Sequence, residues 1–435
     1  MGHGPLLEEI ARGYEMSHNP QHELFEQRQS FFLPASSQLR GAVAAFVLIG
    51  ITTLGIGLSK ADLQTRVWGA LLFNTFFFFA LSLGGSAFAA MQDVIGAKWG
   101  RPIMRIHEAF SSFVPLAALI FLAVLGCIKF NVASADKVYS WIANPDVIHH
   151  FWGKRSWLVE NFWLIRDICA LAIIVGLVYW QIGMKTDRDR TFVAGNKDEA
   201  AAKGVKVRDT LRYWSAPLLV VYSLCFTLLA FDLMMSLAPT WFSTLWGGWL
   251  FAVMMQTLMA TLILTMWALK GTTIGQYIKQ SQFHDIGKLM HGFSIFFAYL
   301  TYAHVLTYWY GNMPEETEYF IHRLHAPWIY IVLIAPILSF LVPLYGLIPK
   351  ASKWTKMIVG PIAIGILVAQ WFTYLLVVMP EVVKKGPFGL PFIEVGIFFG
   401  IFGLFLGSFA SFGRRNPMVA VADPLLHASL SEAHH

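Results

Sequence analysis

The sequence predicts an all-α integral membrane protein with about ten transmembrane helices and with both chain ends in the cytoplasm. Three observations support this prediction. Hydrophobic residues fill 56% of the 435 positions and charged residues only 13%, whereas a soluble domain has roughly 25% charged residues. Long apolar segments recur along the whole chain. Lys and Arg are concentrated in one of the two sets of loops that join these segments.

The apolar segments are long enough to cross a bilayer, which takes about 20 residues of helix. The candidate spans are residues 41–58, 67–93, 106–127, 160–183, 213–236, 242–269, 284–310, 326–348, 355–379 and 391–412. Because their number is even, both chain ends lie on one side. We therefore expect an N-terminal tail over residues 1–40 and a C-terminal tail over residues 413–435, on either side of a transmembrane domain over residues 41–412.

The basic residues set the orientation. Most of them fall in the tails and in the loops on the same side, whereas the opposite loops hold fewer and include the acidic residues Glu315, Glu316 and Glu318. The positive-inside rule then places both tails in the cytoplasm. The net charge of +6 follows from this topology and gives no reason to expect nucleic-acid binding. The polar first forty residues do not resemble a cleavable signal peptide.

Two connections between spans are long. Residues 184–212 mix both signs of charge and are expected to form a solvated cytoplasmic connection. Residues 128–159 lie on the opposite side and are rich in aromatic residues and histidine. This second connection is interpreted either as a docking surface or as an interfacial aromatic belt. Its residues of interest are Trp141, His149, His150, Phe151 and Trp152.

The cysteines do not form a recognisable redox or metal motif. Cys127, Cys169 and Cys225 each lie inside or at the end of an apolar segment, with no paired spacing. We expect packed thiols rather than disulfides or metal ligands. The sequence also lacks a Cys-x-x-Cys-His string, so no covalently attached haem c and no metal site are predicted in this chain.

Ionisable residues inside the spans are the candidates for function, because each costs about 2.5–3.5 kcal/mol at a helix centre. Arg166 and Asp167 lie about 10 Å from the outer end of the fourth span. Asp232 ends the fifth span at a similar level, and Glu394 begins the tenth there. Since Arg166 and Asp167 are adjacent and point in different directions, their partners are expected to come from other helices.

A second group of polar residues lies toward the cytoplasmic side. His107 and Glu108 open the third span, while Lys288 and His291 share a face of the seventh span with Tyr302. Such a stripe suits proton transfer, because histidine titrates near neutrality and hydroxyls both donate and accept. The alternative is that these groups only satisfy one another in the core. Residues near helix ends, such as Glu108, are expected to reach water.

The complete set of candidate proton-path residues is as follows: Asp232, Asp167, Arg166, His291, His304, Lys288, His107, Glu108, Tyr299 and Tyr302. No catalytic residue is predicted. A haem b site is also considered, since His291 and His304 share the seventh span. Thirteen residues separate them, so they point roughly 140° apart around the helix axis. Two stacked haems are not expected, whereas a single haem held by one of these residues and His107 stays open.

Three strings in the sequence together resemble a known family. They are Gly96-Ala97-Lys98-Trp99-Gly100-Arg101-Pro102 with the following Arg105-Ile106-His107-Glu108, the stretch Phe231 to Gly247, and Tyr308-Trp309-Tyr310-Gly311-Asn312-Met313-Pro314-Glu315-Glu316-Thr317. Over roughly residues 40 to 415 the chain resembles the polysulfide-reductase-type (NrfD-like) membrane proteins of bacterial alternative complex III. Of these it is most similar to the accessory one, which is distinct from the one that binds quinol. The Asn-x-Pro-Glu-Glu-Thr string is the most specific of the three.

The resemblance implies two four-helix bundles, near residues 67–236 and 242–379, with flanking helices 41–58 and 391–412. It also implies a non-catalytic subunit of a quinol:electron acceptor oxidoreductase in the bacterial cytoplasmic membrane. Quinone, iron–sulfur clusters and haem c would belong to partner subunits, namely a quinol-binding NrfD-like membrane protein, an iron–sulfur protein and multihaem cytochromes c. A haem–copper oxidase is a further candidate partner. This chain would contribute membrane scaffold and a proton route.

The resemblance places weight on Asp232 and on the Arg166–Asp167 pair. The chain departs from the family pattern after Asp232: relatives tend to have an aromatic residue, an acid and a histidine where it has Leu233, Ala238 and Thr240. Any proton role for those three positions is therefore not expected here.

Two other functions remain as alternatives. In one, the buried charges only fix helix packing and the chain is a structural scaffold. In the other, the chain itself binds quinone, with a tunnel lined by aromatic residues and methionine of the second and sixth spans. The stripe Phe76–Phe79 of the second span is expected to face lipid, which argues against that tunnel.

Overall fold

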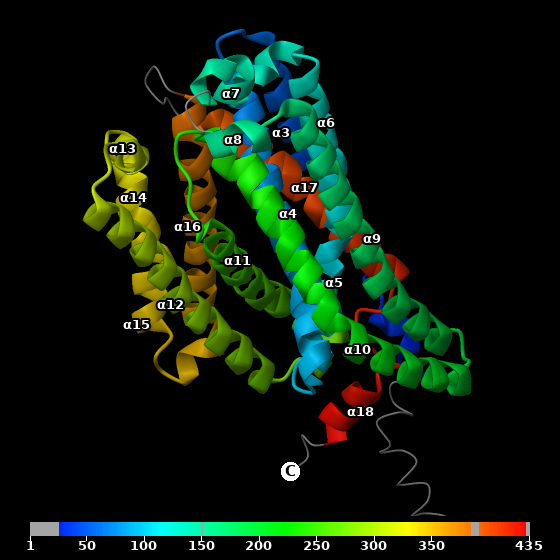
Figure 1. The fold of residues 1–435 in the computed structure, drawn as a ribbon. Helices are drawn as coiled ribbons and strands as arrows, with labels where there is room; N and C mark the ends of the chain where they lie inside the picture. The colour runs from blue at the N-terminus through cyan, green and yellow to red at the C-terminus, as the bar shows by residue number, and fades with distance from the viewer. Residues whose placement is uncertain (1–25, 149–151, 384–390, 432–435) are drawn as a thin grey trace, which may run out of the picture.

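The computed structural model describes residues 26–148, 152–383 and 391–431. These residues form helices and connecting turns, with no β-strand among them. Ten helical segments in this part of the chain are long and apolar enough to cross a membrane, which confirms the predicted number. The chain thus has the make-up of a multi-pass membrane protein (Figure 1).

The ten segments are, in chain order, α3 (Ser37–Ser59), α4 (Gln64–Ile95), α5 with α6 (Met104–Phe110 and Val114–Lys129), α9 (Glu160–Val193), α10 (Lys197–Leu229), α11 (Trp246–Leu269), α12 (Gln280–Gly311), α14 with α15 (Trp328–Pro336 and Val342–Gly346), α16 (Lys356–Val382) and α17 (Phe392–Arg415). The shorter helices used below are α7 (Ser140–Ala143), α8 (Trp152–Trp157), α13 (Pro314–Arg323) and α18 (Pro424–Ser431). A π-helical turn follows α10 at Ala230–Met234, and another joins α14 to α15 at Ile337–Leu341.

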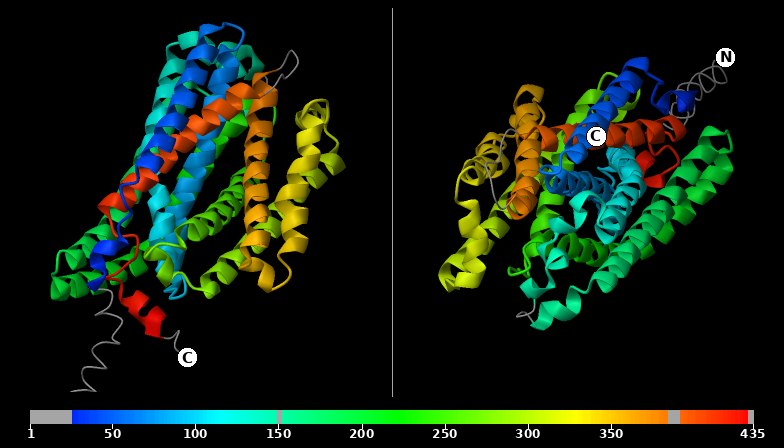
Figure 2. Two further views of the ribbon diagram at one scale, coloured as in Figure 1. Left: turned by 180° about the vertical axis from the view of Figure 1, so that it is seen from behind. Right: turned by 90° about the horizontal axis from the view of Figure 1, so that it is seen from above.

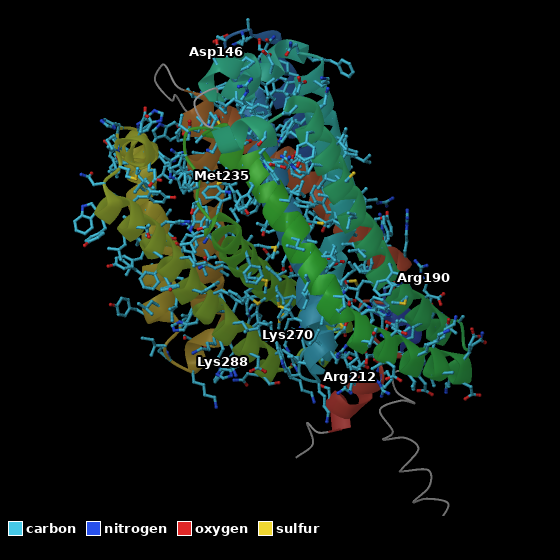
Figure 3. All side chains as sticks on the ribbon, in the orientation of Figure 1. Asp146, Arg190, Arg212, Met235, Lys270 and Lys288 are labelled. Atoms are coloured by element: carbon cyan, nitrogen blue, oxygen red, sulfur yellow. The ribbon has the colours of Figure 1, made fainter. Side chains whose placement is uncertain are left out.

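Both described ends of the chain lie at the same end of the molecule, as an even number of crossings requires (Figures 1 and 2). We call this the terminal end, and the opposite end, with α7, α8 and α13, the distal end. Figure 3 places Arg190, Arg212 and Lys288 toward the terminal end and Asp146 at the distal end. The cytoplasmic location of the terminal end stays a prediction from the loop charges.

Helix α4 is the central helix of the fold. It contacts α10, α11, α16 and α17 as well as α5 and α6. The side chains of Phe76–Phe79 are at most 3% exposed, and they pack against Phe121, Tyr374 and Phe398. The expectation that this stripe faces lipid is wrong, because a helix surrounded by other helices buries its apolar residues on all sides.

The first and last long helices, α3 and α17, pack closely against each other. A Cβ atom on Gly50 would lie 2.4 Å from the Cα atom of Gly400, and one on Gly396 would lie 2.2 Å from Thr53 Oγ1. Small residues permit this approach of two backbones, as they do at many membrane helix interfaces. Phe46 and Phe399 stack beside the contact, with ring centroids 5.4 Å apart. Helix α17 also contacts α4.

Residues 184–212 match the predicted solvated connection only in part: many of them are exposed, but they form the ends of two helices and several charged side chains are buried. Helix α9 continues to Val193, the chain turns at Gly195, whose φ of +101° favours glycine, and α10 begins at Lys197. Lys185, Arg188 and Asp189 are at most 2% exposed. A helix of about 20 apolar residues is long enough to cross only the hydrocarbon layer of a bilayer. Helices α9 and α10 have 34 and 33 residues, so they extend well beyond that layer.

The C-terminal segment is also packed rather than free. Residues 418–421 are fully buried, and the Met418 amide donates to the Phe31 carbonyl at 2.8 Å. A free tail beginning at residue 413 is therefore not observed. The segment lies against the terminal ends of the helices, close to α18 in Figure 1.

The aromatic connection near the distal end is folded onto the helices. Trp141 is 3% exposed and its ring lies 5.6 Å from that of Trp163, so it contributes neither to a docking surface nor to an interfacial belt. His149, His150 and Phe151 lie outside the described residues. The docking interpretation of this connection thus remains untested for its histidines.

Candidate functional site

The polar group around Asp232 is built on an irregular turn. After Leu229 the helix α10 widens into the π-turn Ala230–Met234, a geometry often found at functional sites. Neighbouring side chains bind its backbone: Trp163 Nε1 donates to the Asp232 carbonyl at 3.1 Å, and the Tyr139 hydroxyl donates to the Leu233 carbonyl at 2.9 Å. Burial raises the pKa of Tyr139 well above its ordinary value, and the charges of Asp167 and Asp232 raise it further.

The Asp232 side chain forms an ion pair between two helices. Arg166 Nε on α9 lies 2.5 Å from Asp232 Oδ2, with side-chain exposures of 8% and 1%. Trp157 Nε1 donates to the other carboxylate oxygen at 2.9 Å. The guanidinium group also lies 3.9 Å from the Trp157 ring centroid and 4.6 Å from that of Phe162, so two aromatic rings shield the pair. A partner from another helix, as predicted for Arg166, is confirmed.

Asp167 is fully buried beside this pair and has a different environment. Neither of its carboxylate oxygens has a hydrogen-bond donor among the described residues. It directly follows Arg166, the partner of Asp232, in the sequence. Arg166 Nη2 is also buried without an acceptor in the described part of the chain, so the site holds unused donors and acceptors that a water molecule would satisfy.

Toward the terminal end, side chains of α4, α5, α9 and the segments next to them form a closed ring of alternating charges, which we call the charge ring. Its eight members, in order around the ring, are Asp93, Arg101, Asp423, Arg188, Asp189, Arg105, Glu108 and Lys185. Each side chain lies within 3.3 Å of two opposite charges, and none is more than 5% exposed. Four positive and four negative groups cancel, so the ring carries no net charge.

The charge ring joins three separated parts of the chain, residues 93–108, residues 185–189 and Asp423. Asp93 lies on α4, Arg105 and Glu108 on α5, Lys185 on α9, and Asp423 in the segment after α17. Burial alone would raise the pKa of Asp423, but Arg188 and Arg101 lower it to about 2. Glu108, expected to reach water, is instead fully buried between Arg105 and Lys185.

His107 lies next to the charge ring but does not form part of it. It is fully buried, its Nδ1 atom lies 3.0 Å from the Gly85 carbonyl oxygen and its Nε2 atom lies 3.5 Å from Gln92 Nε2. Gly85 permits this contact, because a Cβ atom there would lie 2.1 Å from the His107 carbonyl oxygen. Both ring nitrogens thus face polar groups of α4.

The structure does not bring the predicted polar stripe of α12 close to the charge ring and His107. Lys288 is exposed and pairs with Asp285 on its own helix at 2.7 Å. His291 Nδ1 lies 3.2 Å from the Pro343 carbonyl oxygen on α15. Tyr299 and Tyr302 are 63% and 64% exposed. These four side chains therefore do not continue the polar group of His107 and Glu108.

His304 lies on the inner side of α12, in a separate polar group. Its Nε2 atom lies 2.7 Å from Ser243 Oγ, and the Tyr308 hydroxyl donates to the Phe242 carbonyl at 2.5 Å. Trp246 Nε1 donates to the Ala230 carbonyl at 3.0 Å. Since Ser243 and Trp246 both belong to the segment that follows the Asp232 turn, this segment contacts both His304 and the turn itself. The His291 and His304 side chains bind different elements, in line with their predicted directions around the helix.

Sequence analysis missed several buried polar groups. Arg66 forms a bidentate ion pair with Glu394, with Nε 2.7 Å from Oε1 and Nη2 3.0 Å from Oε2. Gln256 donates to Ser294 and to the Ser339 carbonyl in the π-turn before α15, and accepts from Gln370. For the charge ring, a signal was present: Lys185, Arg188 and Asp189 have the three- and four-residue spacing of a single helix face.

The described residues contain no cluster of three or more His, Cys, Asp or Glu side chains that could hold a metal ion. The three cysteines are free, and Cys169 is exposed rather than packed in the core. When the chain is compared with profiles of known protein families and with curated protein sequences, none of them matches.

Proposed function

We propose that this chain is a membrane subunit of a quinol:electron acceptor oxidoreductase of the alternative complex III type, located in a bacterial cytoplasmic membrane. The three sequence strings that resemble the accessory NrfD-like protein of that complex support this proposal. In it, the chain carries no redox centre and provides part of a proton route. Electron transfer through iron–sulfur clusters and haem c belongs to the partner subunits.

The observation that carries the proton role is the fully buried Asp167, which has no hydrogen-bond donor among the described residues and lies next to Arg166 of the Arg166–Asp232 pair. A buried acid without a hydrogen-bond donor is suited to take up and release a proton. Asp232 is fixed by Arg166 and Trp157, so Asp167 is the member of the group that is free to change its protonation. We therefore assign the distal half-route to Asp167 and Asp232.

We assign the terminal half of the proton route to α4, α9 and α10 rather than to α12. Beyond the charge ring and His107, Gln181 Nε2 donates to the Ser86 carbonyl at 3.2 Å and its Oε1 atom accepts from the Tyr222 hydroxyl at 3.2 Å. Tyr222 precedes Asp232 by ten residues, or about 15 Å of helix. Water or side-chain movement has to carry the proton across this gap. Lys288, Tyr299 and Tyr302 are not part of this route.

A structural role is the second candidate, and the charge ring favours it for the terminal end. A buried, fully paired and electrically neutral network contributes little net stability compared with apolar packing, but it fixes which groups meet. The ring ties α4, α5 and α9 to the C-terminal segment. We assign the charge ring to assembly of the fold, and Asp167 and Asp232 to proton transfer.

Purification of the chain from native membranes in mild detergent tests the assignment to a complex. Co-purification with a multihaem cytochrome c and an iron–sulfur protein is expected, while the separated chain binds neither haem nor iron. Recovery of the chain alone, or with a haem of its own, would overturn the proposal.

The proton role is tested in the purified complex reconstituted into vesicles. Asp232→Asn should preserve quinol oxidation but lower the number of protons moved per electron. The matched control is Glu160→Gln on the same helix, α9, as Arg166, since Glu160 forms only a half-exposed pair with Lys129. Equal proton-to-electron ratios in both variants would leave the scaffold role as the better account.

A further inference from the structure

A pocket of about 630 Å³ lies toward the terminal end, between α6, α9 and α17. Its volume is in the range of ligand sites in proteins. Helices α9 and α17 both run from the distal to the terminal end, so residue numbers measure depth along the pocket. Its lining extends from Val178 to Arg190 on α9 and from Gly403 to Arg415 on α17, or about 18 Å along each helix. The pocket is therefore elongated along the direction of the two helices.

The lining of the pocket changes from apolar to cationic along its length. Val178 and Leu404 line the inner part, whereas hydroxyl groups and two arginines line the part nearer the terminal end. On α17, Leu404 is followed by Ser408, Ser411 and Arg415, at spacings of four, three and four residues. Such spacings place the four side chains on one helix face. A molecule with a charged head and an apolar chain matches this order of groups.

The two arginines lie at the level of the lipid head groups. Arg190 follows the end of the predicted span 160–183 by seven residues, and Arg415 follows the end of the span 391–412 by three. These spacings correspond to about 10 Å and about 5 Å of helix. Each head-group layer adds about 5–8 Å to the hydrocarbon core of a bilayer. The guanidinium groups therefore lie where the phosphate groups of the bilayer are expected.

Both arginines are available to an anion. They are exposed, and neither forms an ion pair or a side-chain hydrogen bond with any described residue. Asp187 and Asp189, the acids nearest to Arg190 in sequence, pair with Lys203 and with the charge ring. No Asp or Glu of the described residues lines the pocket, so the ammonium group of a zwitterionic lipid would lack a partner there. Two cations without an acid favour an anionic phosphate, which arginine binds through charge-assisted hydrogen bonds.

We propose that this pocket binds an anionic phospholipid, with its phosphate between Arg190 and Arg415 and one acyl chain along Val178 and Leu404. Basic pockets between transmembrane helices are suited to such head groups. The Ser411 and Ser408 hydroxyls lie about one and two turns inward from Arg415, at the depth of the ester groups that join the head to the acyl chains. This inference adds a lipid ligand to the chain and depends neither on the proposed complex nor on the proton route.

The test measures lipid binding to the delipidated full-length chain in detergent by native mass spectrometry, with phosphatidylglycerol and phosphatidylethanolamine of the same acyl chains. Arg190→Gln and Arg415→Gln each remove one cation of the pocket. Arg212→Gln is the matched control, because Arg212 is also exposed toward the terminal end (Figure 3) but does not line the pocket. Thermal unfolding of each variant verifies that it is folded.

A second pair of variants tests the pocket without changing its charge. Gly183→Phe fills the pocket, because Gly183 lines it and a Cβ atom there has no neighbour within 4 Å. Gly176→Phe places the same ring on another glycine of α9 whose Cβ position is equally open but which does not line the pocket. The arginine variants keep the test decisive if Gly183→Phe does not fold.

We expect phosphatidylglycerol to bind more tightly than phosphatidylethanolamine, with about a fivefold loss of affinity for each pocket arginine removed. Gly183→Phe should also weaken binding, whereas Arg212→Gln and Gly176→Phe should bind as the wild-type protein does. A phosphatidylglycerol with a photoreactive group on one acyl chain should label peptides of α6, α9 and α17.

Equal affinities for the two lipids, or equal losses in Arg190→Gln and Arg212→Gln, would overturn the proposal. So would competition by glycerol 3-phosphate as strong as that by the lipid, because the pocket would then be a site for a free phosphate. Labelling confined to peptides of other helices would likewise place the lipid elsewhere.

Discussion

Asp423 lies eight residues beyond the end of α17 and contacts Arg188 of α9, with Nη1 and Oδ2 3.2 Å apart. Through this contact and that with Arg101 at 3.3 Å, a segment outside the long helices completes the buried charge ring. Removal of one partner from a buried ion pair leaves an uncompensated charge and is more damaging than removal of both. The C-terminal segment is therefore expected to be part of the folded core rather than an appendage.

Asp423→Asn should destabilise the protein by about 3 kcal/mol, within the range for broken buried pairs. The substitution keeps the side-chain oxygen that accepts from the Leu425 amide but leaves Arg101 and Arg188 each with one fewer anion. Thermal unfolding of the purified chain in detergent measures the change. Asp187→Asn is the control, because Asp187 is 68% exposed and its ion pair among the described residues is with Lys203. An equal shift in both variants would contradict a special role for the ring.

The same residue predicts a pH dependence. The folded-state pKa of Asp423 is about 2, below the ordinary value of 3.8, so its contribution to stability is present above about pH 4 and is lost as the pH falls through 2. From the size of the shift that contribution is about 2 kcal/mol. Unfolding curves between pH 6 and pH 3 should show a smaller acid-dependent loss in Asp423→Asn than in the wild-type protein. Parallel curves would refute the linkage.

The Arg166–Asp232 pair should behave as a unit. Arg166→Met or Asp232→Leu alone is expected to cost about 3–5 kcal/mol, since each leaves one buried charge without its partner. The double variant should recover much of that loss, because both charges are gone and the new side chains are apolar. A double-mutant cycle by thermal unfolding measures the coupling. Strict additivity of the two single effects would show that the pair does not stabilise the fold.

Close packing of α3 against α17 gives a prediction independent of any charge. Gly400→Ile should destabilise the protein by about 1–3 kcal/mol, the usual cost of overpacking, because a Cβ atom there would lie 2.6 Å from the Cα atom of Gly50. Gly407→Ile on the same helix is the control, since its nearest neighbour is a Val43 methyl group at 3.3 Å that is able to move. Similar unfolding temperatures for the two variants would contradict the close approach.

Hydropathy and spacing were enough to predict the ten helices and to single out Arg166, Asp167 and Asp232, because unpaired charges are rare inside long apolar segments. Hydropathy and spacing did not predict which polar side chains contact one another between helices. Lys185, Arg188 and Asp189 look like solvated residues until the opposite charges of the other segments are placed around them. The face shared by Lys288, His291 and Tyr302 was a correct inference from periodicity, but periodicity does not tell which side of a helix its neighbours cover.

Asp167→Asn separates a proton carrier from a structural residue more sharply than any other single change. Asparagine has nearly the same shape, and Asp167 takes part in no ion pair closer than 4 Å among the described residues, so the free energy of unfolding should change by less than about 1 kcal/mol. An amide cannot exchange a proton with Asp232, however, so proton movement by the reconstituted complex should fall at least tenfold while quinol oxidation with an uncoupler persists. A stable variant with normal proton movement would exclude Asp167 from the route, and a strongly destabilised one would show that its role is structural.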